Sequence, residues 1–537
     1  MSTANQDDWT SIAAKAQTRL INSIPSDWRI PPSKLPKDDE LNVTGFPAKC
    51  GILNDFELEI TESLATDIVG RLAAGEWTAV EVTTAFCKRA AIAHQVTRCL
   101  TITMFDDAMK RAKQLDEHFS KTGQTVGPLH GLPISLKDNF NIIGKPSSVG
   151  FCSWALDPMQ EESSLVGMLR DLGAVLYTKT NVPTAMMIAE SVNNCYGRTV
   201  NPLNRALTSG GSSGGESALI AMCGSPLGVG TDIGGSLRIP AACTAIFTIR
   251  PSFGRFPHFD ARSGLAGQES VASVQGPMAR SIADLRLWSE SIIGAEPWLR
   301  DPKCLEIPWR QVQLKPKLKI AVLWDNGIVT PTPPVKRALK TVVEKLKAKG
   351  YDIVDWKPDF HQEILDIMAK LFLADGGKSV RKILEPVDEP FRPEMEPYAN
   401  SPEMTVYELW QVQKARTALC KKYLDRWQAC EGLDAILGPT TPYTAPKNGE
   451  FKHVGYTGVF NVLDYSAVSF PTGIHADKMV DISPSDFKPY SEMDAVTNKD
   501  YDAVAVHGMP VSLQLTGRKL QEEKILAITE RVLADLA

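Results

Sequence analysis

The stretch from Thr208 to Pro240 decides the fold, because it contains two glycine loops that each carry serines. The first reads Thr208-Ser-Gly-Gly-Ser-Ser-Gly-Gly-Glu216, and the second reads Gly228-Val-Gly-Thr-Asp-Ile-Gly-Gly-Ser-Leu-Arg-Ile-Pro240. A helical segment, Ser217–Cys223, lies between them. Nine glycines fall within the 26 residues from Gly210 to Gly235, whereas the usual glycine share predicts roughly two. This density indicates backbone that turns sharply and approaches other groups closely.

Three common glycine motifs match this stretch only in part, and they stay open as minor alternatives. A phosphate-binding loop has a lysine directly after its glycines, and none follows here. A dinucleotide-binding fingerprint opens a helix, and Pro240 argues against a helix at this point. Gly210–Gly214 satisfies the G-x-S-x-G pattern of a nucleophile elbow, with a histidine as its base. An elbow follows directly on a buried strand, however, and Val200–Ser209 is typical of a loop.

The composition excludes several classes of protein. The chain has 537 residues, with 58 Lys and Arg against 63 Asp and Glu and a formal charge of −5. This balance argues against a basic nucleic-acid-binding protein. A hydrophobic share of 43% and a charged share of 23% exclude a collagen-like or largely disordered chain. We therefore expect a globular protein whose partner is small and is not a polyanion.

The cysteines and the apolar runs bear on the compartment. The ten cysteines form no C-x-x-C pair, and Met1–Asp8 does not have the pattern of a signal peptide. We therefore expect reduced, mostly buried thiols and a cytoplasmic protein. Because no run of 18 or more apolar residues occurs, no membrane span is expected.

Hydrophobic periodicity outside the glycine loops indicates the α/β class. Lys319–Leu323 is predicted as a strand, Val335–Lys349 as a helix and Asp352–Val354 as the next strand. This order is a βαβ unit and predicts a mixed sheet. Nearer the N-terminus, Thr61–Ala74 is predicted as one helix, and a capping box at Thr78 opens another that runs to about His94.

The N-terminal part differs from the rest of the chain. Trp9–Ile24 has weak helical patterning, and a segment punctuated by prolines follows it. We interpret residues 1–55 as an arm that wraps a surface. Residues 56–537 are interpreted as one large domain, because the sequence shows no internal repeat and no other linker.

Upstream of the glycine loops, Gly131-Leu-Pro-Ile-Ser-Leu-Lys-Asp138 is predicted as a short apolar strand that delivers Lys137. Together with Ser212 and Ser236, this pattern resembles the amidase signature family, hydrolases with a Ser–cis-Ser–Lys triad. The resemblance is unbroken from Gly210 to Pro240. It extends to Pro128–Asp138, Thr178–Pro183 and Asn201–Pro202. Beyond the signature, the chain resembles the fungal acetamidase, or general amidase, branch, with matching segments at Arg250–Arg255, Gly267–Ser270, Ala295–Trp298 and Gly508–Val511.

The resemblance implies a fold and an activity. The implied fold is a single large α/β domain with a central mixed, mostly parallel twisted β-sheet covered by helices on both faces. The implied activity is that of an acylamide amidohydrolase. It cleaves the C–N bond of a monocarboxylic acid amide to acid plus ammonia or amine through an acyl-enzyme. The family implies no cofactor and no metal, a small-molecule amide as substrate, and no nucleic acid; a homodimer is compatible with it.

Alignment to the family motif assigns the catalytic residues. Ser236 is the nucleophile, Lys137 is the general base in its neutral form, and Ser212 bridges the two, with a cis peptide bond from Gly211. A free lysine titrates near 10.4, so the pKa of Lys137 has to be lowered for this role. The apolar neighbours of Lys137 on its strand are consistent with a buried site, where burial disfavours the charged form.

The resemblance also implies the residues around the triad. Gly234 and Gly235 lack side chains, so backbone N–H groups can turn inward as an oxyanion hole. Arg238 has two interpretations: a cation that helps to keep Lys137 neutral, or a structural ion pair with Asp232. Met186 aligns with a substrate-contacting position, although core packing is the common role of a buried methionine. The full set is Ile233, Gly234, Gly235, Ser236, Ser212 and Met186 for the oxyanion hole and substrate, with Ser213, Asp232 and Arg238 in support.

Four other functions share some of these features. The same chemistry fits a tailoring or detoxifying amidase for one specific secondary metabolite or xenobiotic amide. A glutamine-hydrolysing subunit of a tRNA amidotransferase has the same core but requires partner subunits. A non-catalytic binding protein would not need all three triad residues. A fatty-acid amide hydrolase role is disfavoured by the lack of a membrane-anchoring apolar segment before the core. Pocket walls are expected from Val149–Trp154 and Tyr456–Asp464, and they leave the acyl size open.

Overall fold

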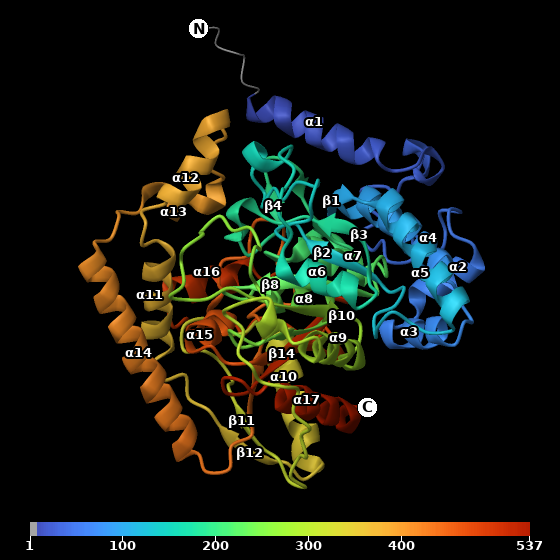
Figure 1. Ribbon diagram of the computed structural model, residues 1–537. Coiled ribbons are helices and arrows are strands. Elements are labelled where there is room, and N and C mark those ends of the chain that lie inside the picture. Colours follow the sequence, from blue (N-terminus) through green and yellow to red (C-terminus); the bar gives the residue numbers. More distant parts are fainter. Residues whose placement is uncertain (1–7) are drawn as a thin grey trace.

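An eleven-stranded sheet runs through the computed structural model, which describes residues 8–537 (Figure 1). The expectation about a signal peptide at Met1–Asp8 therefore falls almost entirely outside the described residues. In spatial order the strands are β1 (Leu100–Thr103), β3 (Val175–Thr180), β2 (Pro133–Lys137), β8 (Leu227–Asp232), β10 (Val274–Ala279), β9 (Phe247–Arg250), β14 (Ala467–His475), β15 (Pro510–Thr516), β13 (Ala435–Pro439), β11 (Lys319–Val322) and β12 (Asp352–Asp355).

The sheet is mixed, as expected. Parallel pairs occur in two groups, β3-β2-β8 and β13-β11-β12. The centre, from β8 through β10, β9, β14 and β15 to β13, is antiparallel, and so is the pair of β1 with β3. The expected parallel pairing thus belongs to the two flanking groups. The first of these groups carries Lys137 at the end of β2.

Helices cover both faces of the sheet (Figure 1). The helices are α1 (Trp9–Asn22), α2 (Asp55–Glu62), α3 (Ala65–Ala73), α4 (Ala79–Thr97), α5 (Phe105–Thr122), α6 (Ser164–Asp171), α7 (Gly214–Ala221), α8 (Arg238–Thr244), α9 (Ile282–Gly294), α10 (Pro333–Ala348), α11 (His361–Phe372), α12 (Lys378–Leu384), α13 (Glu396–Asn400), α14 (Val406–Ala429), α15 (Gly455–Leu463), α16 (Glu492–Asp500) and α17 (Glu522–Leu536).

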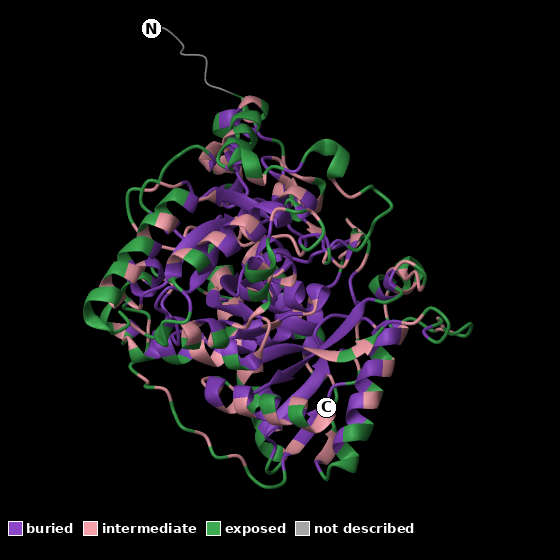
Figure 2. Ribbon diagram, turned by 90° about the vertical axis from the view of Figure 1, so that its right-hand side faces the viewer, coloured by how far each residue is buried: buried purple, intermediate pink, exposed green. Residues whose placement is uncertain are grey.

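Successive residues of a strand point to opposite faces of the sheet, so their contacts show which helices pack on each face. On β15, Leu513 and Leu515 belong to the apolar cluster formed with α9, α10 and α17. Gln514, between them, instead bonds Arg238 of α8 on the opposite side. The buried residues concentrate on the sheet and on the inner sides of the helices (Figure 2). The face that holds α7 and α8 is therefore the one that carries the two glycine loops.

The predicted βαβ unit is confirmed, since β11, α10 and β12 follow one another and the two strands pair in parallel. The single helix predicted over Thr61–Ala74 is wrong. Helix α2 ends at Glu62 and α3 begins at Ala65, with Ser63 and Leu64 in extended conformation between them. A capping box at Asn54 starts α2 earlier than the apolar pattern indicated, and the Ser63 hydroxyl bonds the Glu59 carbonyl at its end.

The argument from Pro240 against a helix is also wrong, because Pro240 is the third residue of α8. The first N–H groups of a helix have no acceptor within it, so proline is tolerated there. The segment expected to be a loop, Val200–Ser209, forms a small separate hairpin of β6 (Val200–Asn201) and β7 (Asn204–Thr208) outside the main sheet. No strand of the main sheet runs into the first glycine loop.

The N-terminal arm contacts the rest of the chain through α1. Its inner face is buried in the same apolar cluster as α4 and α5. The Gln17 amide donates to the Cys195 carbonyl at 2.6 Å, and Arg19 donates to the Ala155 carbonyl at 3.0 Å. A domain boundary at residue 55 stays a prediction.

Candidate active site

Lys137 ends strand β2 with its side chain on the α7 face of the sheet, and it is completely buried. Its Nζ donates to the Ser212 hydroxyl at 2.8 Å and to the Thr231 hydroxyl at 2.7 Å. Among the described residues, no carboxylate forms an ion pair with Lys137. The lysine is thus held by hydroxyl groups, which serve a neutral amine as well as a charged one.

Burial lowers the pKa of Lys137 from 10.5 to about 7, against the opposing charges of Asp232 and Glu216. Glu216 lies on α7, where its carboxylate accepts from the hydroxyls of Ser135 and Thr180. Burial raises the pKa of Glu216 from 4.5 to about 7. Around neutral pH, a substantial fraction of Lys137 is therefore uncharged, as a general base requires.

The two glycine loops meet beside Lys137. The Gly211–Ser212 peptide bond is cis, in agreement with the geometry implied by the sequence resemblance. The Ser213 N–H donates to the Ser236 carbonyl at 3.2 Å, which joins the first loop to the second. Gly210 has a φ of +77° and a Cβ there would lie 2.7 Å from the Pro240 Cα, so only glycine allows this approach.

Ser236 is the most accessible of the three residues. It is 9% exposed, against 1% for Ser212 and 0% for Lys137. Within residues 8–537, its hydroxyl has no hydrogen-bond partner, and its carbonyl anchors it to Ser213. The structure therefore brings Ser236 to the loop that holds Ser212, with its hydroxyl unengaged.

Asp232 organises the loop that carries Ser236. Its carboxylate accepts hydrogen bonds from the backbone N–H of Gly235 at 2.8 Å and of Leu237 at 3.2 Å. It also forms a buried ion pair with Arg238, from Nε to Oδ2 at 3.1 Å. Burial by itself raises the pKa of Asp232, but Arg238, helped by Arg250 and Asn461, more than offsets this and the pKa falls to about 2. Of the two interpretations of Arg238, the structure shows the ion pair.

This arrangement also corrects one part of the expected oxyanion hole. Because the Gly235 N–H is bonded to Asp232, it is not free to face a substrate. Gly235 has a φ of +134° and packs directly against Thr457, which leaves no room for a side chain. Gly235 thus serves the shape of the loop, while the N–H groups of Ile233, Gly234 and Ser236 remain as candidate donors.

Comparison with known proteins assigns the family. A sequence model of the family described as Amidase matches residues 81–526. This chain belongs to the amidase family. An acetamidase from Emericella nidulans is 42% identical, over 98% of this chain and 97% of that protein. An acetamidase from Aspergillus oryzae is 40% identical, over 98% of both chains. The protein is therefore an amidase-type hydrolase.

Solved structures agree with this assignment. A structure titled fatty acid amide hydrolase superposes with a TM-score of 0.94 at 36% identity, and covers 98% of this chain and 95% of that one. A peptide amidase from Stenotrophomonas maltophilia has a TM-score of 0.67 at 22% identity, over 88% and 97% of the two chains. The second likeness shows the amidase fold alone.

Two cavities of this amidase adjoin the loop of Ser236. The larger, about 450 Å³, is lined by Leu371 and Phe372 at the end of α11, and a Cβ at Gly234 would lie 3.6 Å from the Phe372 ring. The smaller, about 230 Å³, is lined by Ile233 and His258. The segment from Leu265 to Glu269 separates the two cavities and lines both.

The remaining predicted residues lie near these features. Met186 is half-buried in the apolar cluster that contains Leu265 and Phe151, so it packs next to the cavities. The Ser213 hydroxyl donates to the Thr231 carbonyl at 3.3 Å and so supports the strand beside Lys137. Of the expected pocket walls, Tyr456–Asp464 coincides with α15, which holds the loop of Ser236 from behind through Thr457.

Sequence reasoning missed three residues of this site. Thr231 contacts Lys137, Asn461 donates to Asp232 at 2.7 Å, and Thr457 donates to the Gly234 carbonyl at 2.7 Å. Thr231 stands directly before Asp232 in the second glycine loop, and this position was a usable signal. The two α15 residues fall within the segment expected as a pocket wall, but their contacts with the second glycine loop, more than 200 positions away in the sequence, were not predicted.

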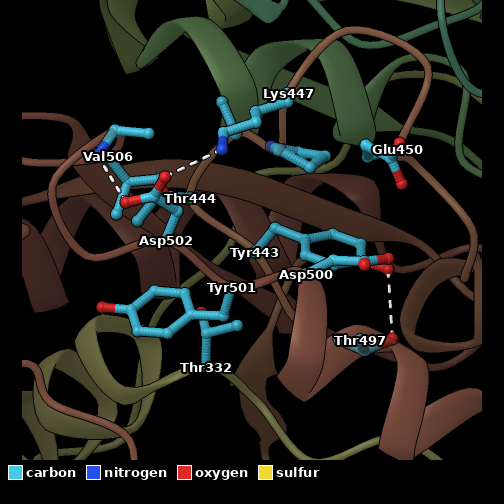
Figure 3. A pocket seen from close by; sticks show the side chains of 13 residues that line it. Thr332, Tyr443, Thr444, Lys447, Glu450, Thr497, Asp500, Tyr501, Asp502 and Val506 are labelled. Atoms are coloured by element: carbon cyan, nitrogen blue, oxygen red, sulfur yellow. Dashed lines mark hydrogen bonds and ion pairs between the residues drawn. The ribbon is translucent and has the colours of Figure 1, made fainter.

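A separate hollow lies between the segment 443–450 and the end of α16 (Figure 3). Its charged residues are all paired: Lys447 with Asp502 at 2.8 Å, and Glu450 and Asp500 with Lys452 at 2.8 and 2.7 Å. Tyr443 and Thr497 share a hydrogen bond of 3.4 Å. With a volume of about 20 Å³, it has room for one water molecule. None of the three residues predicted to form the triad lines it.

Three further observations concern the chain as a whole. All ten cysteines are free thiols. In the part of the chain that the structure describes, no group of three His, Cys, Asp or Glu residues is arranged to hold a metal ion. No helix from residue 8 onward is both long enough and apolar enough to cross a bilayer.

Proposed function

We propose that this amidase is a serine amidohydrolase for monocarboxylic acid amides, with a Ser236–Ser212–Lys137 triad. In the first step the Ser236 oxygen attacks the amide carbon and transfers its proton to Ser212, which passes its own proton to neutral Lys137. The proton then returns through Ser212 to the amide nitrogen as the C–N bond breaks. Ammonia or an amine leaves, and the acyl group stays on Ser236. A water molecule, activated by the same relay, hydrolyses the ester and regenerates the serine.

The observation that carries this proposal is the environment of Lys137. A completely buried lysine whose only side-chain partners among the described residues are two hydroxyls has its charged form disfavoured, and its hydrogen bond to Ser212 connects it to the first glycine loop. A lysine retained for stability would instead be expected to have a carboxylate partner. The accessible and unengaged hydroxyl of Ser236 supports its role as nucleophile.

Oxyanion stabilisation is proposed for the N–H groups of Ile233, Gly234 and Ser236. Preorganised donors of this kind act in a water-excluded site, where each typically contributes about 2.7–4 kcal/mol to the transition state. Met186 is proposed to contact the substrate, because it packs against the segment that separates the two cavities.

The test is ammonia release from simple amides by purified Ser236→Ala. We expect its kcat to fall to background, because the acyl group has no acceptor. Ser217→Ala is the matched control. Ser217 lies on α7, just after the first glycine loop, and its hydroxyl bonds only the backbone carbonyls of Ser209 and Gly214, so wild-type activity is expected. Wild-type activity in Ser236→Ala would refute the proposal.

The substrate is proposed to be a small aliphatic amide, and the similarity to two fungal acetamidases supports this. Comparing kcat/KM across acyl chain lengths, from acetamide upward, tests this. A strong preference for one bulky amide would instead favour a tailoring or detoxifying role. The cytoplasmic location and the homodimer remain predictions from the sequence.

A further inference from the structure

A buried glutamine beside the active site has no hydrogen-bond partner. Gln275 lies on β10 and is 1% exposed, and neither its Oε1 nor its Nε2 is paired with any described residue. A buried polar atom left unpaired typically costs about 1–3 kcal/mol. Such a group is therefore retained when water, a ligand or an alternative side-chain position satisfies it.

Gln275 stands next to the residue that holds Lys137. In the antiparallel pairing of β10 with β8, Gln275 lies directly opposite Thr231. Side chains of directly opposed residues project from the same face, with Cβ atoms about 4.5–5.5 Å apart. The Gln275 amide is thus adjacent to the Thr231 hydroxyl that accepts the hydrogen bond of Lys137.

The Thr231 hydroxyl accepts a hydrogen bond from Lys137, and its own proton also needs a hydrogen-bond acceptor. Among the described residues, no acceptor for this proton is present. Neutral Lys137 has a single lone pair, and the base can serve Ser212 only if that lone pair faces the Ser212 hydroxyl. If the Thr231 proton pointed to Lys137, the two hydroxyls would compete for the lone pair.

We propose that Gln275 is a positioning residue for Lys137, whose Oε1 accepts the Thr231 hydroxyl proton, directly after a side-chain rotation or through one water. Thr231 then receives its hydrogen bond from Lys137, and the lysine lone pair is left for Ser212. This role rests on the proposed function of Lys137 as general base. It deepens that proposal by naming a residue outside the triad that sets the direction of the relay.

The side chain of His258 is a neighbour of the Gln275 amide. The Nδ1 atom of His258 is buried and unpaired, and its side chain is close enough to Gln275 for the two to interact. Burial lowers the pKa of His258 from 6.5 to about 4, so the ring is neutral and has one acceptor nitrogen. The proposed role requires the orientation in which Gln275 Nε2 faces His258 and Oε1 faces Thr231. His258 also lines the smaller cavity, through which water can reach this position.

Two substitutions test this role. Gln275→Met keeps the size of the side chain and removes its polar atoms. We expect kcat to fall about tenfold with KM within twofold of wild type, because the base is misdirected. The acid limb of the pH–kcat profile should move to lower pH, since a hydrogen bond donated to the lone pair stabilises the neutral amine. Gln275→Glu adds a negative charge near Lys137 and should move the limb to higher pH.

The other charged groups near Lys137 are constant in this comparison. They are Glu216 on α7 and Asp232 at the end of β8, together with His258 after β9, a titratable group whose ring is neutral here. In a Thr231→Val background, Gln275→Met should cause no further loss, because no hydroxyl proton is left to direct. Thr516→Val is the matched control. The Thr516 hydroxyl is also buried and unpaired but lies on β15, so an unchanged pH profile is expected.

Wild-type kcat and an unmoved acid limb in folded Gln275→Met would overturn the role of Gln275. A loss of kcat that adds in full to that of Thr231→Val would overturn it as well, because the two residues would then act independently. Ser236→Ala, measured alongside, separates this failure from failure of the proposed function. If Ser236→Ala retains activity, the triad itself is wrong; if it is inactive while Gln275→Met behaves like wild type, only the positioning role is refuted.

Discussion

Two completely buried lysines lie on neighbouring strands of the sheet, and their partners differ. Lys137 on β2 is held by two hydroxyls. Lys179 on β3 lies 3.5 Å from an Asp138 carboxylate oxygen and also donates to the Pro146 carbonyl at 2.6 Å and the Ser147 hydroxyl at 2.8 Å. Burial lowers both pKa values, to about 7 for Lys137 and to about 8 for Lys179, where the Asp138 charge opposes the shift directly.

The difference shows that partners, and not burial alone, decide what a buried lysine does. Asp138 is itself bound by the Thr101 hydroxyl, the Ser148 hydroxyl and the Val149 N–H. Lys179 and Asp138 thus tie the segment after β2 to the sheet. Lys137 has no carboxylate partner among the described residues, and in the proposed function it is the group that takes up the proton. Removing each lysine should therefore have opposite consequences.

The largest expected effect is on the activity of Lys137→Met. Amide hydrolysis should fall by about 10⁴-fold, because the general base is lost. The free energy of unfolding should stay equal to that of wild type or rise, since methionine fills the space without a buried amine. Ammonia release and denaturant unfolding measure the two quantities. An active Lys137→Met would contradict the assignment of the base.

The next effect is on the stability of Lys179→Met. This change leaves the Asp138 carboxylate buried without its cation, and the free energy of unfolding should fall by about 3–5 kcal/mol. The double variant Lys179→Met/Asp138→Leu is the control and should recover most of the loss. If Lys179→Met unfolds like wild type, the Asp138 pair is not the structural tie described above.

The pH dependence of stability gives a smaller and more specific difference. Between pH 7 and 10.5 the unfolded state keeps the Lys137 proton that the folded state has lost, so this lysine makes stability rise with pH. The contribution is about 1.4 kcal/mol per pH unit. Unfolding of Lys137→Met, measured from pH 7 to 9, should show a shallower rise than wild type. Parallel curves would mean that Lys137 keeps its proton in the folded protein.

The smallest effect concerns Glu216. Its negative charge raises the pKa of Lys137, so Glu216→Gln should lower that pKa and move the acid limb of the pH–kcat/KM profile to lower pH, by less than about one unit. Glu190→Gln is a matched control, because Glu190 is buried but pairs with Arg198 instead. An unmoved acid limb in Glu216→Gln would show that its carboxyl is not charged near Lys137.

Much of the fold and the centre of the site could be predicted from the sequence. The apolar strand before Lys137, the βαβ unit and the two serine loops all depend on local patterns, and local patterns are visible along the chain. The split of α2 from α3 was missed because the apolar spacing continues across Ser63 and Leu64, while the break lies in their backbone conformation.

The parts that escaped prediction depend on contacts between distant segments. Asn461 and Thr457 reach the loop of Ser236 only because α15 packs behind it. The hydrogen bond from the Gly235 N–H to Asp232 depends on the conformation of the loop, which a sequence motif does not specify. Likewise, the position of Gln275 opposite Thr231 depends on the pairing register of β10 with β8, which the sequence does not show.

The most direct test of the account is to trap the acyl-enzyme. Wild-type protein and Lys137→Met, each mixed at neutral pH with an activated acyl ester, would be quenched in acid and analysed by intact-protein and peptide mass spectrometry. The account predicts one acyl group on the peptide that contains Ser236 in the wild type, and none in Lys137→Met or Ser236→Ala. Acylation at another residue, or equal acylation of Lys137→Met, would contradict it.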